Sequence, residues 1–77
     1  LTSDNVIVYN QNNDFVISTG TIIMKTVKVF DIRGRLLQEK NTVNSSQTTI
    51  NSGLSNGVLL IQITAEDGAV VTKKVVR

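Results

Sequence analysis

The sequence contains no cysteine, no histidine and no proline. Without cysteine no disulfide can cross-link the fold, and this absence is compatible with passage through an oxidising compartment. Without histidine and cysteine, the chain has no imidazole or thiolate to bind a metal. It also has no catalytic triad in which histidine activates the nucleophile. A serine activated by lysine needs a desolvated lysine, yet every lysine stands in a polar or strand-edge context: Lys25, Lys28, Lys40, Lys73 and Lys74. We therefore expect neither enzymatic activity nor a cofactor.

Aromatic residues are also few, since Tyr9, Phe15 and Phe30 are the whole set. The core is therefore expected to consist of Val, Ile and Leu, with Phe30 also inside because it lies in a strong strand pattern. Eight basic and six acidic residues give a net charge of +2. That is too mild for nucleic-acid binding, which needs a concentrated basic face. No apolar run approaches the roughly 20 residues of a membrane-spanning helix. Neither nucleic acid nor a small-molecule substrate is expected as a partner.

The length of 77 residues predicts a single domain. A chain of this size buries only about 60% of its unfolded surface, so we expect a thin stability margin. The first residues, Leu1-Thr2-Ser3-Asp4, have neither the basic start nor the apolar centre of a signal peptide, and no initiator methionine precedes them. We expect residues 1–77 to be one domain cut from a larger secreted protein.

The stretch from Gly53 to Thr64 is expected to form the centre of the fold. It opens with a turn signal, Ser55-Asn56-Gly57, because Asn and Gly both accept the positive φ of tight turns. The longest apolar run follows, from Val58 to Ile63, in which only Gln62 is polar. A bounded, largely apolar run of six residues is too short for a typical helix and favours a strand buried on both faces.

Shorter, more polar strands are predicted around this central one. Turn signals recur about every ten residues, a spacing typical of an all-β sandwich. Residues 41–46 are polar and are expected to form a loop. The fold class predicted is a small Ig-like antiparallel β-sandwich of about seven short strands. Besides the central strand, the predicted strands are Val6–Tyr9, Phe15–Ser18, Ile22–Ile32, Arg35–Lys40, Gln47–Ile50 and Val70–Val76.

Several residues are assigned to turn geometry alone: Asp31, Gly34, Asn56, Asp67 and Gly68. The Asp-Gly pair favours a tight hairpin, so the last strand should pair antiparallel with the central one. The other acids, Asp4, Asp14, Glu39 and Glu66, lie mostly in or beside predicted turns and are interpreted in the same way. Residues 10–14 offer oxygen ligands at alternate positions. A calcium loop would want Gly and Glu where Phe15 and Thr21 stand, so ion binding there is left open.

The last strand, Val70–Val76, places one lysine on each of its faces, Lys73 on one and Lys74 on the other. Neither face can therefore be buried along its whole length. Charges placed in this way protect edge strands from unwanted pairing. The alternative is that the basic end, from Lys73 to Arg77, is displayed to a partner that adds a strand at this edge. Both interpretations stay open.

Three blocks of the sequence resemble a known family. Val27-Lys28-Val29-Phe30-Asp31-Ile32-Arg33-Gly34-Arg35-Leu36-Leu37 is similar to the hairpin of the C-terminal sorting domain of the type IX (Por) secretion system. Leu54-Ser55-Asn56-Gly57-Val58-Leu59-Leu60-Ile61-Gln62-Ile63 resembles that family's Gly-Val block, and Lys73-Lys74-Val75-Val76-Arg77 its basic terminal strand. Two departures are the missing prolines after Tyr9 and the Leu59 that replaces a common tyrosine.

The resemblance implies an export signal at the C-terminus of a cargo protein found in the Bacteroidota. Such a domain is recognised in the periplasm by an outer-membrane translocon and a shuttle protein. A cell-surface sortase then commonly removes it, so that the cargo ends on the outer membrane, at the cell surface or secreted. The resemblance assigns recognition to Gly57, Val58, Leu59, Leu60, Ile61, Lys73, Lys74, Val75, Val76 and Arg77.

A second function stays open beside the sorting signal. A small Ig-like domain without catalytic residues can also serve as an accessory module of a secreted enzyme or adhesin, where it binds carbohydrate or separates other domains. Carbohydrate binding usually requires exposed aromatic side chains for stacking. The expectation that Phe30 lies in the core therefore weakens this alternative.

Overall fold

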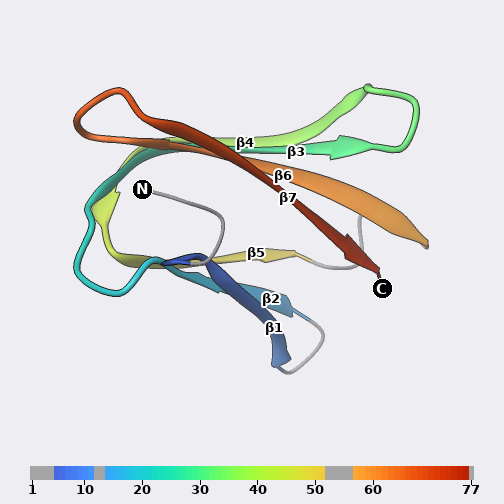
Figure 1. Cartoon of the computed structure of the whole chain (residues 1–77). Helices are drawn as coiled ribbons and strands as arrows, with labels where there is room; N and C mark the ends of the chain where they lie inside the picture. Colours follow the sequence, from blue (N-terminus) through green and yellow to red (C-terminus); the bar gives the residue numbers. More distant parts are fainter. Residues whose placement is uncertain (1–4, 12–13, 52–56, 77) are drawn as a thin grey trace.

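The computed structural model describes residues 5–11, 14–51 and 57–76 of the chain. These residues form seven strands and two sheets (Figure 1). Within the described ranges there is no helix long and apolar enough to cross a membrane. The strands are β1 Ile7–Gln11, β2 Asp14–Ser18, β3 Met24–Asp31, β4 Leu36–Ser45, β5 Gln47–Asn51, β6 Val58–Ala65 and β7 Val70–Val76.

The two sheets pack as a sandwich in which every pairing of neighbouring strands is antiparallel. One sheet has the order β1-β2-β5 and the other the order β4-β3-β6-β7 (Figure 1). In the constant-type immunoglobulin fold the fourth strand lies in the sheet of the first, second and fifth. Here it lies beside β3 in the other sheet. The predicted all-β, Ig-like sandwich is confirmed, with this position of β4.

The core between the sheets is almost entirely aliphatic, as expected from the composition. One aromatic side chain, Phe15, contributes to it. The buried cluster comprises Val6, Phe15, Ile17, Met24, Val27, Val29, Ile50, Leu59, Ile61, Ile63 and Val71. It draws on β2 and β5 from one sheet and on β3, β6 and β7 from the other, so the hydrophobic effect holds the two sheets together.

Strand β6 lies at the centre of this core, but it is buried on one face only. Leu59, Ile61 and Ile63 are fully buried, whereas Val58 and Leu60 on the opposite face are half-buried. The prediction of a strand buried on both faces is therefore wrong. The four-stranded sheet has a partner sheet on one side only, so alternate side chains of β6 face outward even though they are apolar.

Residues 41–45, predicted as part of a loop, belong to strand β4. Between the pairs Met24↔Ser45 and Thr26↔Asn41, β4 advances four residues while β3 advances two. This irregularity includes Asn44, whose φ of 51° lies in the left-handed region. A bulge bends a strand and increases its twist. The bend brings β4 to the point where the chain crosses to the other sheet at Ser46.

The crossing between the sheets is held by polar contacts. The backbone N–H of Thr19, a residue only 2% exposed, donates to the carbonyl of Ser46 at 2.9 Å. The ammonium group of Lys40 donates to the carbonyl of Thr49 and to the hydroxyl of Thr48 at 3.4 Å. Lys40 pairs with the inward-facing Val27, so its side chain extends from β4 to β5 across the open side of the sandwich.

Two hairpin turns share one geometry. The backbone N–H of Asp31 donates to Arg35 O at 3.0 Å, and the carbonyl of Asp31 accepts the N–H of Gly34 at 3.0 Å. In the same way, the N–H of Ala65 donates to Ala69 O at 2.8 Å, and the carbonyl of Ala65 accepts the N–H of Gly68 at 3.0 Å. Gly34 and Gly68 adopt φ values of 86° and 92°. These are the positions where a three-residue hairpin loop needs a left-handed residue after a type I turn. Both predicted hairpins are confirmed.

Candidate recognition surface

The outer face of the four-stranded sheet carries an apolar row across three strands. Phe30 of β3 pairs with Leu36 of β4 on one side and with Leu60 of β6 on the other. Leu60 in turn pairs with Lys74 of β7, which ends the row with a cation. Phe30 and Leu60 are half-buried, and Leu36 is 48% exposed. We call Leu36, Phe30 and Leu60 the apolar row.

A second outward pair extends the apolar row toward the end of the sheet. Val58 at the start of β6 pairs with Val76 of β7, which is 66% exposed. In the other direction the outer face becomes polar, because the next cross-strand row contains Glu39, Lys28 and Gln62. Lys28 and Glu39 form an ion pair at 3.6 Å. The contiguous apolar side chains of the outer face therefore lie at one end of the sheet, while Val70, 54% exposed, lies apart from them at the other end.

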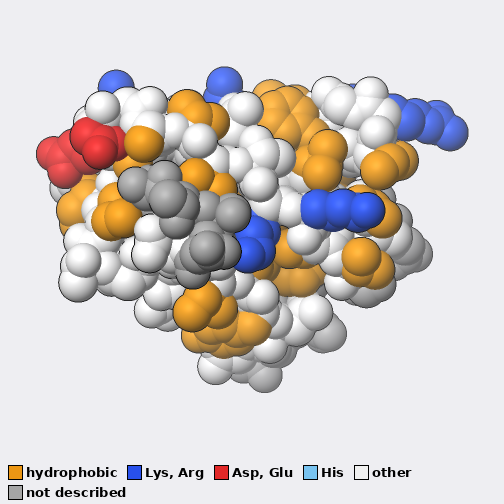
Figure 2. All heavy atoms as spheres, in the orientation of Figure 1, with side chains coloured by type: hydrophobic (Ala, Val, Ile, Leu, Met, Phe, Trp, Pro, Cys, Tyr) orange, Lys and Arg blue, Asp and Glu red, His pale blue; other side chains and the backbone are white. Residues whose placement is uncertain are grey.

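Basic side chains stand beside this apolar end. Arg33 and Arg35 lie in the β3–β4 turn and Lys74 lies in β7. Figure 2 shows hydrophobic and basic side chains together at the end of the molecule where this turn lies. The acidic side chains visible in that view gather at the opposite end, where the β6–β7 turn with Glu66 and Asp67 lies. The apolar surface is thus flanked by positive charge.

Asp31 organises the turn that presents the two arginines. Its carboxylate accepts the backbone N–H groups of Arg35 and Arg33, each at 2.9 Å, and the Nε–H of Arg35 at 3.1 Å. The backbone hydrogen bond from Arg35 is the largest cause that lowers the pKa of Asp31 below its ordinary value, while burial of the carboxyl opposes it. Asp31 is therefore ionised at neutral pH and holds the turn closed.

The recognition residues implied by the resemblance divide between the two faces of one sheet. Val58, Leu60, Lys74 and Val76 are on the outer face. Leu59 and Ile61 are fully buried in the core, and Lys73 and Val75 are half-buried on the inner face of β7. Gly57, with a φ of 93°, is exposed and precedes β6. Arg77 and Asn56 lie outside the described residues.

Phe30 and Leu36 also belong to the outer face of the four-stranded sheet. The sequence-based prediction placed Phe30 in the core and did not assign Leu36 to a surface. Phe30 was expected in the core, but its side chain is on the outer face. The signal was present in the sequence, because Val27 and Val29 face inward and strand alternation then points Phe30 outward. Leu36 could not be assigned in this way, since an irregularity between Val29 and Phe30 shifts the register of β4.

Comparison with known families gives one match over the full length. The family described as a domain of unknown function, DUF8694, matches residues 1–77. The chain belongs to this family. Among curated proteins, none matches the sequence. Family membership thus covers all seven strands.

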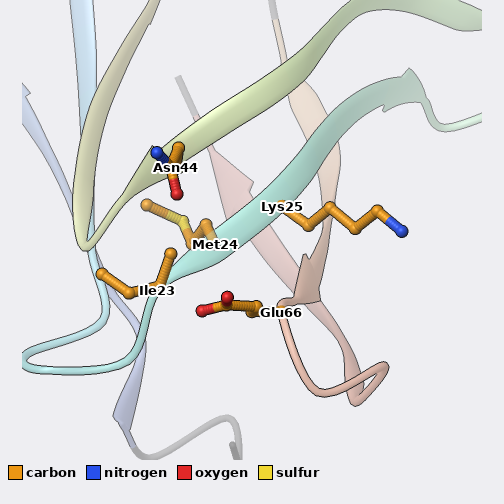
Figure 3. Close-up of a pocket in the computed structure, with 5 residues that line it drawn as sticks. All are labelled: Ile23, Met24, Lys25, Asn44 and Glu66. Carbon is orange, nitrogen blue, oxygen red and sulfur yellow. The ribbon is translucent and has the colours of Figure 1, made fainter.

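A small hollow lies at the end of the domain opposite the apolar row. It has a volume of about 260 Å³ and is lined by Ile23, Met24, Lys25, Asn44 and Glu66. Figure 3 shows Lys25 extending away from the other four side chains. The hollow lies at two strand irregularities, the bend in β4 and a bulge at Lys25 between β3 and β6. It offers one carboxylate and one amide beside apolar side chains.

The acidic groups do not gather into a metal site in the part of the chain that the structure describes, where no three metal-binding side chains come together. The polar stretch considered for calcium is mostly strand, because Asn10 and Gln11 belong to β1 and Asp14 belongs to β2. Asn12 and Asn13 lie outside the described residues.

Proposed function

We propose that this domain is an export signal that the type IX secretion machinery recognises, directing a periplasmic cargo across the outer membrane. The support is the position of the three resembling blocks. The first block includes most of β3, its turn and the start of β4, the second includes most of β6, and the third includes the end of β7. These four strands are neighbours in one sheet, and the other sheet contains none of the blocks.

The outer face of that sheet is the surface we assign to recognition. Val58, Leu60, Lys74 and Val76 offer apolar contact area and positive charge that a folded partner can reach. Leu59 and Ile61 are inaccessible in the folded domain, and their role is to hold the sheet on the core. An exposed apolar patch with a polar rim is a common mark of a protein-interaction site.

The proposed partners follow from the resemblance. A translocon and a shuttle protein would bind the domain in the periplasm, and a sortase would remove it at the cell surface. The domain itself would then catalyse no reaction, and its role would be to present the outer face of the sheet and the end of β7 to these partners. The cargo would precede Leu1.

A secretion assay tests this function. Residues 1–77 are fused behind a signal peptide and a fluorescent reporter, and the fusion is expressed in a host with a working type IX system. We expect reporter outside the cell, and none outside a translocon-deficient strain. Leu60→Thr and Lys74→Glu should lower export with the fold intact. Lys25→Glu makes the same charge change at an exposed position far from the apolar row and should not.

The accessory-module function is the second candidate, because two aromatic rings lie outside the core. Phe30 is half-buried on the outer face, and Tyr9 on β1 is 44% exposed. Both rings are accessible for stacking on a sugar. Reporter that stays in the periplasm, while the host exports its own cargo, would contradict the sorting function. Glycan binding that is lost in Phe30→Ala or Tyr9→Ala would then favour the accessory module.

A further inference from the structure

Among the described residues, the sandwich has four edge strands, which differ in how open they are. β4 has two breaks in its register with β3, and bulges disfavour the addition of a further strand. In β5, the carbonyl of Thr49 already accepts the ammonium group of Lys40. β1 has only five residues. β7 pairs with β6 without a break over seven residues, from Val70 to Val76. It is the longest regular edge of the described fold.

The side chains of β7 make it a poor partner for itself. The strand reads Val-Val-Thr-Lys-Lys-Val-Val, with apolar ends and two lysines at the centre. Antiparallel pairing with a second copy, centred on Lys73, places that residue opposite its own copy. Parallel pairing in register places both lysines beside their counterparts. Like charges directly opposite one another destabilise paired strands, so the charge pattern opposes a dimer through this edge.

The same pattern selects a complementary strand. We propose that the β7 edge binds an extended acidic segment of a partner protein, which adds a fifth strand to the four-stranded sheet. This inference rests on the proposed function, since it names the partner chemistry of the same surface. Backbone hydrogen bonds to β7 would supply affinity, and side chains would supply specificity.

The side-chain pattern of the partner segment can be read from the faces of β7. Lys74 is exposed on the outer face and Lys73 is on the inner face, opposite Ile61. An antiparallel strand therefore needs an acidic residue opposite Lys74, on the outer face. Val70, Val71, Val75 and Val76 at the ends favour β-branched partners. The complementary core is Val-Val-Glu-Thr-Thr-Val-Val, whose glutamate lies opposite Lys74.

The probe is a soluble peptide that contains this core, titrated into the full chain and followed by amide NMR shifts. We expect saturable binding with the largest shifts along β7. A peptide with lysine in place of the glutamate should bind about tenfold more weakly, because the attractive cross-strand pair with Lys74 becomes repulsive. Peptides N-methylated at alternate residues test backbone pairing: methylation of the edge that faces β7 should abolish binding, whereas the opposite phase should not.

Charge reversal on the domain completes the test. Lys74→Glu should weaken the acidic peptide about tenfold and improve the lysine peptide, while Lys25→Glu should change neither. Equal binding of both peptides, or shifts centred on another strand, would overturn the proposal. A stable dimer whose dissociation requires the β7 edge would also overturn it, in favour of a second copy as occupant. If the host exports the reporter fusion but the domain does not bind the acidic peptide, the proposal of an acidic partner strand is refuted and the sorting function stands. If the domain binds the peptide but the host does not export the fusion, the sorting function is refuted and the partner strand stands.

Discussion

The two faces of the four-stranded sheet are both apolar at the start of β6 but have different surroundings. On the inner face, Leu59, Ile61 and Ile63 are fully buried against the other sheet. On the outer face, Val58 and Leu60 are half-buried and belong to a row that ends at Lys74. One run of apolar residues thus contributes both to the core and to an exposed surface.

The difference indicates that apolar character alone does not identify core residues. Solvent-exposed apolar atoms are common on soluble proteins, but a contiguous exposed row at one end of a sheet is less common and suggests contact with a partner. The inner face should therefore determine stability, and the outer face should determine binding. The following predictions separate these two roles, from the largest expected effect to the smallest.

Ile61→Ala should destabilise the domain by about 2–5 kcal/mol, because it removes buried methyl groups and leaves a cavity. The total stability of a small domain is only about 5–10 kcal/mol, so this variant can be largely unfolded. Chemical denaturation measures the loss, and Ile61→Val, expected to cost about 1 kcal/mol, is the milder variant. A loss below that of Leu60→Ala would contradict the assignment of the inner face to the core.

Lys40→Met should destabilise the domain by about 1 kcal/mol, although methionine keeps most of the apolar stem. The substitution removes the ammonium group that donates to Thr49 O and Thr48 Oγ1 across the two sheets. Urea denaturation gives the difference in unfolding free energy. Lys25→Met is the matched control, since Lys25 is exposed and should change stability very little. Equal effects of the two variants would show that the link between the sheets does not contribute.

Leu60→Thr should change stability by less than about 1 kcal/mol, since threonine suits a half-buried strand position. Export and peptide binding are the informative measurements for this variant. If the outer face is the recognition surface, export should fall while the unfolding midpoint stays close to that of the wild type. Normal export together with a large loss of stability would reverse the roles assigned to the two faces.

Asp31→Asn should alter the pH dependence of stability. The pKa of Asp31 is lower in the folded state than its ordinary value of 3.8, so the ionised carboxylate stabilises the fold above that pH. This contribution is lost as pH falls through the lower, folded-state pKa. Denaturation midpoints measured from neutral pH to below pH 3.8 should therefore decline less steeply in the variant than in the wild type. If the midpoints of the variant and the wild type fall equally with decreasing pH, Asp31 does not contribute to the loss of stability in acid.

Much of the local structure was predictable because it depends on neighbouring residues. Alternation in residues 27–29 predicted β3, and the Asp67-Gly68 pair predicted the β6–β7 hairpin. The edge position of β7 followed from its two lysines. Apart from Phe30, the errors concerned residues 41–45 and the outer face of β6. Neither could be resolved locally, since a polar strand is stabilised by its neighbour and a face is buried only where another sheet covers it.

The candidate surface was predictable in part. The resemblance pointed to β6 and β7, but it treated Leu59 and Leu60 alike. Only the packed sheets place Leu59 inside and Leu60 outside, beside Phe30. Leu36 joined the surface through a register shift in β4. Such a shift exchanges the faces of all the residues that follow it, so small local irregularities decide which side chains a partner can reach.

The sequence by itself determined the class of the fold, the number of strands and the positions of the two glycine turns. These features depend on β-propensity, on alternation and on the left-handed backbone at Gly34 and Gly68. Only the tertiary structure decided which sheet receives β4, which face of β6 is covered and which edge stays regular. Those outcomes depend on contacts between residues far apart in the chain, whose energies no local pattern contains.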